Sequence, residues 1–356
     1  MMPPGENVRH SDDADPIRLG IVGCGSVAQL CHLKALEILP QFDVSILCDR
    51  KPSTALAAKT TFGLGAAVTE NHRDFAGQVD AAIVCVWPRD HLEVSSELMA
   101  MGIDVLCEKP VAISAADATA MAGAAGRSDR ILAVGQWCRC LKSSWLLRRV
   151  LSLGLLGEIL EIDAEFGNVL RWPMSSDAYF DRRLTPGGVM FDAGIHVIDL
   201  VVWLFGEIFQ IEFEDDSFGG VEANGILRGA VTVDGRPVPC HVAASWTHAL
   251  RNCVRIRGTL GEAEARLGST DELALSLIAG GRRVHVSMPA RDLEFPFSSS
   301  NPYAAQLEDF AMAVRTRRAP ITPVDTAILP IKIIEAAYAA RRILEQPWLA
   351  PWVAVS

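Results

Sequence analysis

One stretch of the chain places three ionisable side chains on a single face of an otherwise apolar helix. In GGVMFDAGIHVIDLVVWLF, the residues Asp192, His196 and Asp199 follow the spacing i, i+4 and i+7, which puts them on one side of a helix. Such groups are costly to bury unless they are paired or used. We interpret Asp192 and His196 as an acid–base pair, whereas for Asp199 a structural hydrogen-bonding role stays open.

A second stretch, VLCEKPV, ends a buried strand with two adjacent charges. Glu108 and Lys109 follow the apolar run directly, and Pro110 restricts the backbone next to the lysine. Charges at the end of a core strand must face either bulk water or a group that needs them. Lys109 is therefore a candidate for a cation held against a ligand.

The turn GCGSVA links these residues to a cofactor site. It follows the apolar strand-like run IRLGIVGCG and opens the helical pattern SVAQLCHLKALEIL. In a dinucleotide-binding turn, Gly23 permits the tight bend, Gly25 lets a pyrophosphate approach the backbone, and the small Ala28 allows close helix–strand packing. With Asp49 at the end of the second strand, this context predicts nucleotide binding rather than a merely structural turn.

The pattern of apolar runs predicts two domains with different architectures. After a disordered tail at 1–15, strands alternate with helices through 16–137, which predicts an α/β Rossmann domain with a doubly wound parallel sheet. From residue 138 the alternation stops. Seven strand-like runs at 207–288 predict a largely antiparallel sheet in an α+β domain at 138–356.

Two helices are predicted to close the chain. Asn301 and Pro302 can start the first, whose apolar face includes Leu307 and Phe310. The second is expected over residues 325–346. Pro330 lies inside it, where proline marks either a kink or a later start.

Composition excludes several classes of function. The chain has 356 residues, half of them hydrophobic, and a formal charge of −10 without a basic block, which argues against nucleic-acid or anionic-membrane binding. No run approaches the roughly 18 apolar residues of a membrane helix, and the polar start has no signal-peptide core. Most of the nine cysteines lie in apolar strands, so we expect a cytoplasmic protein. Cys138 and Cys140 have no matching pair, and no metal site is predicted.

Taken together, these motifs resemble the glucose–fructose oxidoreductase, inositol dehydrogenase and rhizopine catabolism (Gfo/Idh/MocA) family. The resemblance spans nearly the whole chain after the tail, and rests on GCGSVA, WPRDH, CEKP, GGVMFDAGIHVIDLVVWLFG and NPYAAQLEDFAMAVRTRRAP. The combination of EKP with a later G-G-x-x-x-D-x-G-x-H is far more specific to that family than the glycine turn alone.

The resemblance implies an NAD(P)-dependent oxidoreductase. It would transfer hydride between nicotinamide and a secondary alcohol or ketone of a sugar, polyol or sugar derivative. Lys109 would be the catalytic lysine near the nicotinamide, with Asp192 and His196 completing the site. In that scheme His196 takes the hydroxyl proton, Lys109 stabilises the developing alkoxide, and Asp192 orients the hydroxyl or the imidazole. The second domain would have an open sheet whose outer face forms a homodimer or homotetramer.

Further residues are predicted to bind the cofactor and the substrate. The cofactor set is Gly23, Gly25, Ser26, Val27, Asp49, Arg50, Trp87, Pro88, His91, Glu108 and Lys109. The substrate set is Gln136, Arg139, Trp172, Tyr179 and Arg183. Trp87, Pro88 and Arg89 replace the Thr-Pro-Asn that is common in the family.

We expect NAD as the cofactor, with NADP possible. The carboxylate of Asp49 can bond the ribose hydroxyls and would repel a 2′-phosphate, whereas Arg50 and Lys51 could pair with that phosphate. Because the strand fixes Asp49 while the two cations sit on a solvated turn, the carboxylate is expected to dominate.

Two other functions remain open. A glycosidase that oxidises a sugar transiently with bound NAD would produce no net NADH. A non-catalytic sensor of NAD(P) or sugar is expected to lack the lysine or the histidine, and this chain contains both Lys109 and His196.

Overall fold

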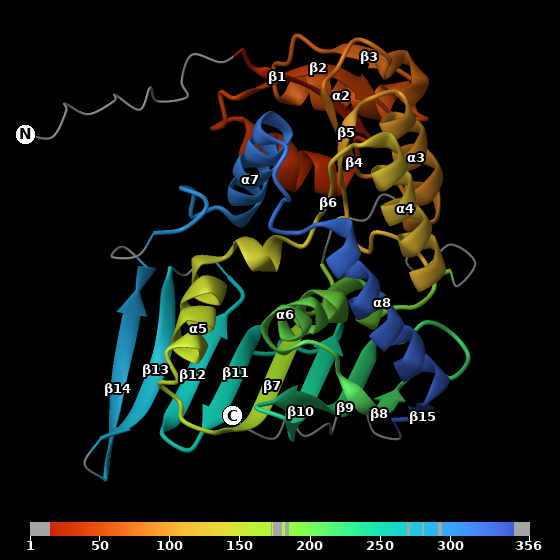
Figure 1. The fold of residues 1–356 in the computed structure, drawn as a ribbon. Coiled ribbons are helices and arrows are strands. Elements are labelled where there is room, and N and C mark those ends of the chain that lie inside the picture. Colours follow the sequence, from red (N-terminus) through yellow and green to blue (C-terminus); the bar gives the residue numbers. More distant parts are fainter. Residues whose placement is uncertain are drawn as a thin grey trace, which may run out of the picture.

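The computed structural model contains two sheets, one above the other, joined by helices (Figure 1). It describes residues 15–171, 173, 180–181, 185–268, 271–279, 281–290 and 294–344. Almost all of the expected disordered tail, and the substrate candidates Trp172, Tyr179 and Arg183, lie outside the described residues. No helix in the described part of the chain is both long and apolar enough to cross a membrane.

The first sheet has six parallel strands in the order β3-β2-β1-β4-β5-β6. The strands are β1 (Ile17–Val22), β2 (Phe42–Cys48), β3 (Ala67–Thr69), β4 (Ala81–Val84), β5 (Asp104–Cys107) and β6 (Leu132–Val134). Chain order reverses between β1 and β4. In sheets of this kind, ligands bind outside the carboxyl ends of the strands at that point. The predicted doubly wound α/β fold is confirmed.

Helices cover both faces of the first sheet. They are α1 (Lys34–Leu36), which continues a π-helix at Ala28–Leu33, and α2 (Pro52–Thr61), α3 (His91–Ala100) and α4 (Ala115–Ser128). Ile21, Ile83 and Leu106 are fully buried, as expected for strands enclosed on both sides. This cover leaves the strand ends as the accessible part of the sheet.

The second sheet has nine strands in the order β14-β13-β12-β11-β7-β10-β9-β8-β15. They are β7 (Ile159–Gly167), β8 (Phe209–Asp215), β9 (Asn224–Val233), β10 (Arg236–Ser245), β11 (Cys253–Gly258), β12 (Gly261–Arg266), β13 (Glu272–Ala279), β14 (Arg282–Pro289) and β15 (Arg341–Ile343). Only the β7–β10 and β8–β15 pairs of this sheet are parallel. The prediction of a largely antiparallel sheet is therefore confirmed.

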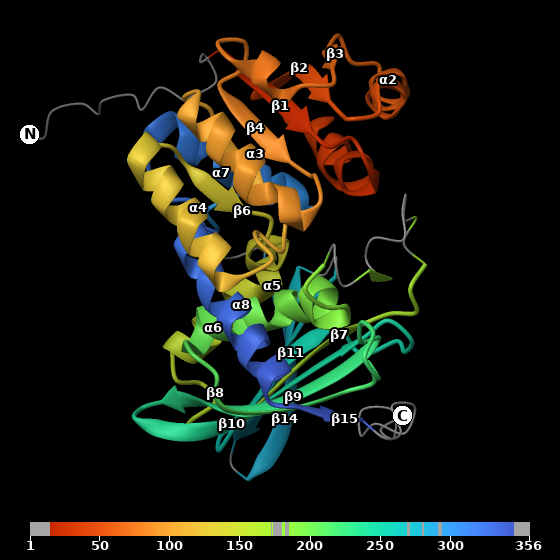
Figure 2. The same ribbon diagram turned by 90° about the vertical axis from the view of Figure 1, so that its right-hand side faces the viewer.

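Helices lie on the side of the second sheet that faces the first sheet (Figure 2). They are α5 (Lys142–Ser152), α6 (Ile195–Phe205) and α8 (Val324–Ala339). A π-helix at Met190–Gly194 leads directly into α6. The wider turns of the π-helix change the angle about the helix axis that separates Asp192 from Asp199. In the structure Asp192 contacts Lys109, whereas Asp199 contacts Arg139.

The last two helices join the two halves of the molecule. The helix α7 (Pro302–Thr316) is capped by Asn301, as predicted, but it packs on the first sheet although it follows the second in sequence. Its Leu307 and Phe310 share a buried cluster with Leu19 of β1. The helix α8 contacts both α4 and α6. The predicted domain limits at 137 and 138 stay a prediction.

The end of α8 differs from the sequence expectation. The helix begins at Val324, so Pro330 lies inside it and does not mark a later start. It ends at Ala339, and the chain continues as β15, which pairs in parallel with β8. The predicted helical end at 346 is therefore wrong. In the strand that replaces it, Arg341 forms an ion pair with Asp215 of β8.

Candidate active site

A cavity of about 470 Å³ runs along the carboxyl ends of β1, β2, β4 and β5. All the predicted cofactor residues except His91 line it: Gly23, Gly25, Ser26, Val27, Asp49, Arg50, Trp87, Pro88, Glu108 and Lys109. Sequence reasoning missed other residues of the lining, including Thr54, Glu70, His72, Asp90 and Glu93. Asp90 lies within WPRDH, although no role was predicted for it, and the other four lie on loops and helices that carry no recognisable motif.

The glycine turn has the geometry that a dinucleotide requires. Gly23 has a φ of +89°, and a Cβ there would lie 2.6 Å from the carbonyl oxygen of Cys85, so only glycine fits. Around Gly25, in contrast, a Cβ would meet nothing within 4 Å. This open approach to the backbone leaves room for a pyrophosphate, and the residues present therefore fit the cofactor.

The backbone holds the carboxylate of Asp49 in place. One oxygen accepts a hydrogen bond from the amide of Cys24 at 2.9 Å, and the other accepts from the amide of Lys51 at 2.8 Å. The side chain of Arg50 is 69% exposed and lies 3.7 Å from Asp90. The fixed acid and the exposed cation agree with the expectation that the acid dominates.

His91 has a different place from the one expected. Its two ring nitrogens lie 3.0 Å from the carbonyl oxygens of Val86 and Pro110, and the side chain is buried. Burial lowers the pKa of His91 in spite of these carbonyls. The imidazole thus connects the turns after β4 and β5 and is not part of the cavity lining, and its assignment as a cofactor ligand stays a prediction.

Lys109 and Asp192 meet across the two halves of the molecule. The Lys109 ammonium donates to the Asp192 carboxylate at 2.8 Å and to its backbone carbonyl at 3.0 Å. A small cavity between Trp87, Pro110 and Asp192 adjoins this pair. Trp87 lines this small cavity and also the larger cofactor cavity, so the pair lies where the cofactor cavity reaches the second half.

The Asp192 carboxylate remains ionised. Burial alone would raise its pKa, but the charge and hydrogen bond of Lys109 and the indole of Trp246 together hold the pKa below the ordinary value. Trp246 donates to the second carboxylate oxygen at 2.9 Å. Sequence reasoning did not identify Trp246, because nothing in its local sequence indicates a polar contact.

His196 lies one helical turn after Asp192 and is only 4% exposed. The rings of Trp137 and Phe166 pack against it, with centroid distances of 5.4 and 5.7 Å. Burial, followed by the positive charge of Lys109, lowers its pKa well below the usual value, and the opposite effect of Asp192 is weaker. Nδ1 has no hydrogen-bond partner among the described residues. The imidazole is therefore neutral near pH 7 and able to accept a proton.

The buried carboxylate of Glu108 contacts the backbone of Lys109. This carboxylate lies 2.8 Å from Nε2 of His32 and accepts a hydrogen bond from the amide of Lys109 at 3.0 Å. Burial would raise the pKa of Glu108, but His32 and then Lys109 hold it below the ordinary value. A Cβ at Gly135 would lie 2.8 Å from the Glu108 carboxyl carbon, so the residue directly after β6 has no room for a side chain. His32 was not identified from sequence.

Arg139 and Asp199 form a buried ion pair beneath the site. Two hydrogen bonds of 2.6 and 2.7 Å connect them, and Arg139 also donates to Thr326 of α8 at 3.0 Å. Arg139 is 1% exposed, and these donors contact groups inside the protein. Its role in substrate binding stays a prediction, and the ion pair gives Asp199 the buried partner that a structural role requires. Gln136 is also buried, and its Oε1 has no hydrogen-bond partner among the described residues.

Family models match both halves of the chain. The model of an oxidoreductase family with an NAD-binding Rossmann fold matches residues 17–136, and that of the GFO/IDH/MocA C-terminal domain matches residues 145–264. Among characterised proteins, the rhizopine catabolism protein MocA of Rhizobium meliloti is 27% identical over 337 residues, which cover 90% of this chain and 93% of that protein.

Solved structures share the fold along nearly the whole chain. The aldose–aldose oxidoreductase of Caulobacter crescentus, complexed with glycerol, superposes with a TM-score of 0.79 at 22% identity, covering 91% of this chain and 97% of the other. Levoglucosan dehydrogenase in complex with NADH gives a TM-score of 0.80 at 18% identity, covering 92% and 98%. The predicted NAD(P)-dependent oxidoreductase and its cofactor are confirmed, and the protein belongs to the Gfo/Idh/MocA family of oxidoreductases with an NAD-binding Rossmann fold.

Proposed function

We propose that the protein is a dehydrogenase that oxidises a secondary alcohol of a sugar, a polyol or a sugar derivative. The observation that carries this proposal is the contact of 2.8 Å between Lys109 and Asp192 at the end of the cofactor cavity. When bound, the nicotinamide supplies the acceptor or donor of hydride. The protein must then manage the hydroxyl proton and the charge on the oxygen.

His196 is the proposed general base. A hydroxyl that becomes a carbonyl must lose its proton, and a neutral imidazole can take it. The lowered pKa of His196, caused by burial and by the charge of Lys109, keeps it unprotonated at neutral pH. In the reverse direction the protonated imidazole would return the proton to the alkoxide.

Lys109 is the proposed stabiliser of the alkoxide. Its ammonium is partly buried and is held by Asp192, so it is already oriented before negative charge develops on the substrate oxygen. Asp192 is the proposed anchor of this cation. Because Asp192 neutralises Lys109 in the resting state, the pair can remain buried without a net charge.

The relatives support a sugar or polyol as the substrate. The names of the two solved structures refer to an aldose and to levoglucosan, and the first contains glycerol. Next to the buried Trp246, the ring of Phe180 is 47% exposed, and an exposed aromatic ring suits the apolar face of a sugar.

A substrate screen tests the proposal. The purified protein would be incubated with NAD and with polyols, aldoses, glycosides and nucleotide sugars, and NADH would be measured. We expect net NADH from at least one alcohol, and its loss in Lys109→Met, which deletes the charge but keeps most of the stem. Cleavage of a glycoside without net NADH would instead establish the glycosidase, and ligand binding without turnover would establish a sensor.

We further propose a cytoplasmic homodimer or homotetramer that assembles through the outer face of the second sheet. In the described part of the chain no helix covers this face (Figure 2). Asp163 of β7 pairs with Arg255 of β11 at 3.1 Å on this face. All nine cysteines are free thiols, which suits a reducing compartment. Sedimentation analysis of the wild type and of Arg255→Glu tests the interface, and a monomeric wild type would contradict it.

A further inference from the structure

The carboxylate of Asp192 is held from two sides. Lys109 contacts Oδ1 at 2.8 Å, and the indole N–H of Trp246 donates to Oδ2 at 2.9 Å. Trp246 directly follows β10 and lies 54 residues further along the chain than Asp192. Since each carboxylate oxygen has its own donor, rotation of the carboxylate would break one of these contacts.

The position of Trp246 is itself well determined. Its backbone amide donates to the carbonyl of Ala223 at 2.8 Å, and its own carbonyl accepts from the amide of Leu170 at 2.8 Å. The side chain is 6% exposed, and the ring of Phe180 meets it edge to face. The indole therefore has little freedom to turn away from the carboxylate.

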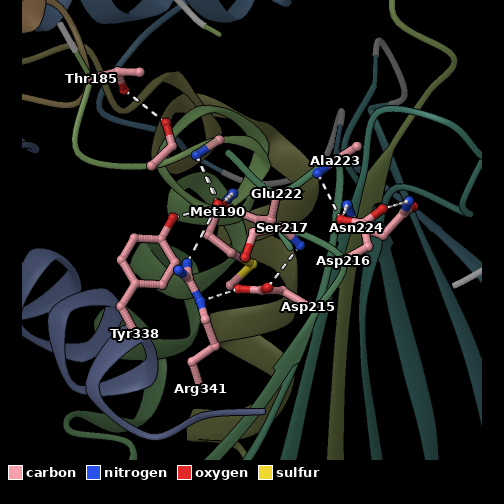
Figure 3. A network of polar contacts seen from close by, with 12 residues as sticks. Thr185, Met190, Asp215, Asp216, Ser217, Glu222, Ala223, Asn224, Tyr338 and Arg341 are labelled. Carbon is pink, nitrogen blue, oxygen red and sulfur yellow. Dashed lines mark hydrogen bonds and ion pairs between the residues drawn. The ribbon is translucent and has the colours of Figure 1, made fainter. Parts of the chain in front are cut away.

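Glu222, the residue before Ala223, contacts the start of the helix that carries Asp192. Its buried carboxylate accepts from the amides of Gly188 and Met190 at 3.0 and 3.1 Å and from the hydroxyl of Tyr338 at 2.5 Å (Figure 3). The backbone amide of Val189 donates to the Glu222 carbonyl at 2.9 Å. These amides belong to the start of the helix that carries the catalytic carboxylate, where a negative charge is favourable.

The packing at this point is close. A Cβ at Gly188 would lie 2.0 Å from the carbonyl oxygen of Glu222, and a Cβ at Gly187 would lie 1.9 Å from the hydroxyl of Tyr338. The two glycines thus allow the helix start to approach Glu222 directly. Residues 222–223 consequently fix both the start of this helix and the backbone of Trp246.

We propose that Trp246, supported by residues 222–223, is a positioning residue that keeps the Asp192 carboxylate turned so that Oδ1 faces Lys109. The inference rests on the proposed function, in which Lys109 stabilises the alkoxide. A neutral donor suits this task, because it satisfies the second oxygen without adding a charge that would compete with the lysine.

Removing the indole N–H should also change the titration of Asp192. Burial acts to raise the pKa of Asp192, while Lys109 and then Trp246 act to lower it. Without the indole the pKa should rise, so that Asp192 becomes protonated, and Lys109 loses its anion, at a higher pH than in the wild type. Activity on the acid side would then be lost at a higher pH.

The first experiment is Trp246→Phe, which keeps an aromatic ring and deletes the donor. We expect kcat to fall by about 10- to 100-fold, as for the loss of a hydrogen bond to a charged group, with the acid limb of the pH profile moved to higher pH and the Kd for NAD unchanged. The matched control is Trp145→Phe, because the Trp145 indole donates to the carbonyl of Arg139 at 2.7 Å, away from the carboxylate. Its acid limb should not move.

A second measurement needs no activity and no folded Trp246 variant. In NMR spectra of the wild type and of Asp192→Asn, the indole N–H signal of Trp246 should shift, because its acceptor changes from a carboxylate to an amide. The signal of Trp145 should stay in place. An unmoved Trp246 signal, or an acid limb in Trp246→Phe that matches the wild type, would overturn the inference. If the wild type transfers no hydride, the proposed function fails, while the NMR comparison still tests the contact.

Discussion

The two halves of the site position their functional groups in different ways. In the Rossmann half, Gly23, Asp49 and Lys109 follow the ends of β1, β2 and β5, and the strands alone bring them to one edge of the sheet. In the other half, Asp192 depends on Trp246 and on the helix start, which are fixed by segments far away in sequence. Strand ends place groups through the backbone, whereas the second half places them through buried side chains. Substitutions at Gly23 and Asp49 should therefore affect cofactor affinity, whereas substitutions of Lys109 and of its partners in the second half should affect turnover.

His196→Ala is expected to show the largest effect and would test the second half directly. Loss of the base should lower kcat by about 10²–10⁴-fold, while the Kd for NAD stays nearly unchanged, because the imidazole does not line the cofactor cavity. Steady-state kinetics and calorimetric titration with NAD measure the two quantities. Wild-type turnover in a folded variant would remove His196 from the mechanism.

Asp199→Asn should lower the free energy of unfolding with little effect on catalysis, although Asp199 lies on the same helix as His196. The substitution leaves Arg139 buried with a charge that has lost its anionic partner, so we expect a loss of about 3–5 kcal/mol in the free energy of unfolding. Turnover per folded molecule should change little. Denaturant unfolding measures the loss. As a control, Asp199→Leu combined with Arg139→Met should recover part of it, since both buried charges are then absent.

Asp49→Ser is expected to act only in the first half. Removal of the carboxylate that is fixed by Cys24 and Lys51 should abolish an expected preference of about tenfold, or ~1.4 kcal/mol, for NAD over NADP. The turnover number with saturating cofactor should remain close to that of the wild type. Dissociation constants for both cofactors decide the matter, and tighter NADP binding by the wild type would contradict the expectation.

The smallest expected effect is a pH dependence of stability. The pKa of His196 is lowered in the folded protein by burial and by Lys109, so the unfolded chain takes up a proton below pH 6.5 that the folded chain does not. Stability should therefore fall as the pH drops below 6.5, by at most about 1.4 kcal/mol per pH unit for this one group. The difference in this slope between the wild type and His196→Ala isolates the contribution, and equal slopes would contradict it.

Local patterns in the sequence were sufficient for most of the fold. The seven strand-like runs correspond to β8 to β14, and the capping residue Asn301 starts α7 where it was expected. Each of these signals is contained within a few neighbouring residues. The meeting of Lys109 with Asp192 also agrees with the roles that the family resemblance implied.

The errors concern residues whose partners are distant in sequence. The chain after Ala339 forms β15 beside β8, where Arg341 pairs with Asp215. Arg139, for which a substrate contact was predicted, has its buried partner in Asp199, 60 residues further along the chain. Trp246 and Glu222 have no local signal at all. A single sequence shows that a side chain is polar or apolar, but it does not show which buried partner the fold provides.

The packing of α7 has a consequence for how this architecture can be cut and recombined. A gene fragment that stops near residue 137 encodes all six strands of the first sheet, yet it omits Leu307 and Phe310, which cover Leu19. Such a fragment would expose a broad apolar surface and should aggregate when expressed alone. A transplantable nucleotide-binding module would have to carry α7 as well, so chimeras between relatives are expected to fold only when the first sheet and this late helix come from the same parent.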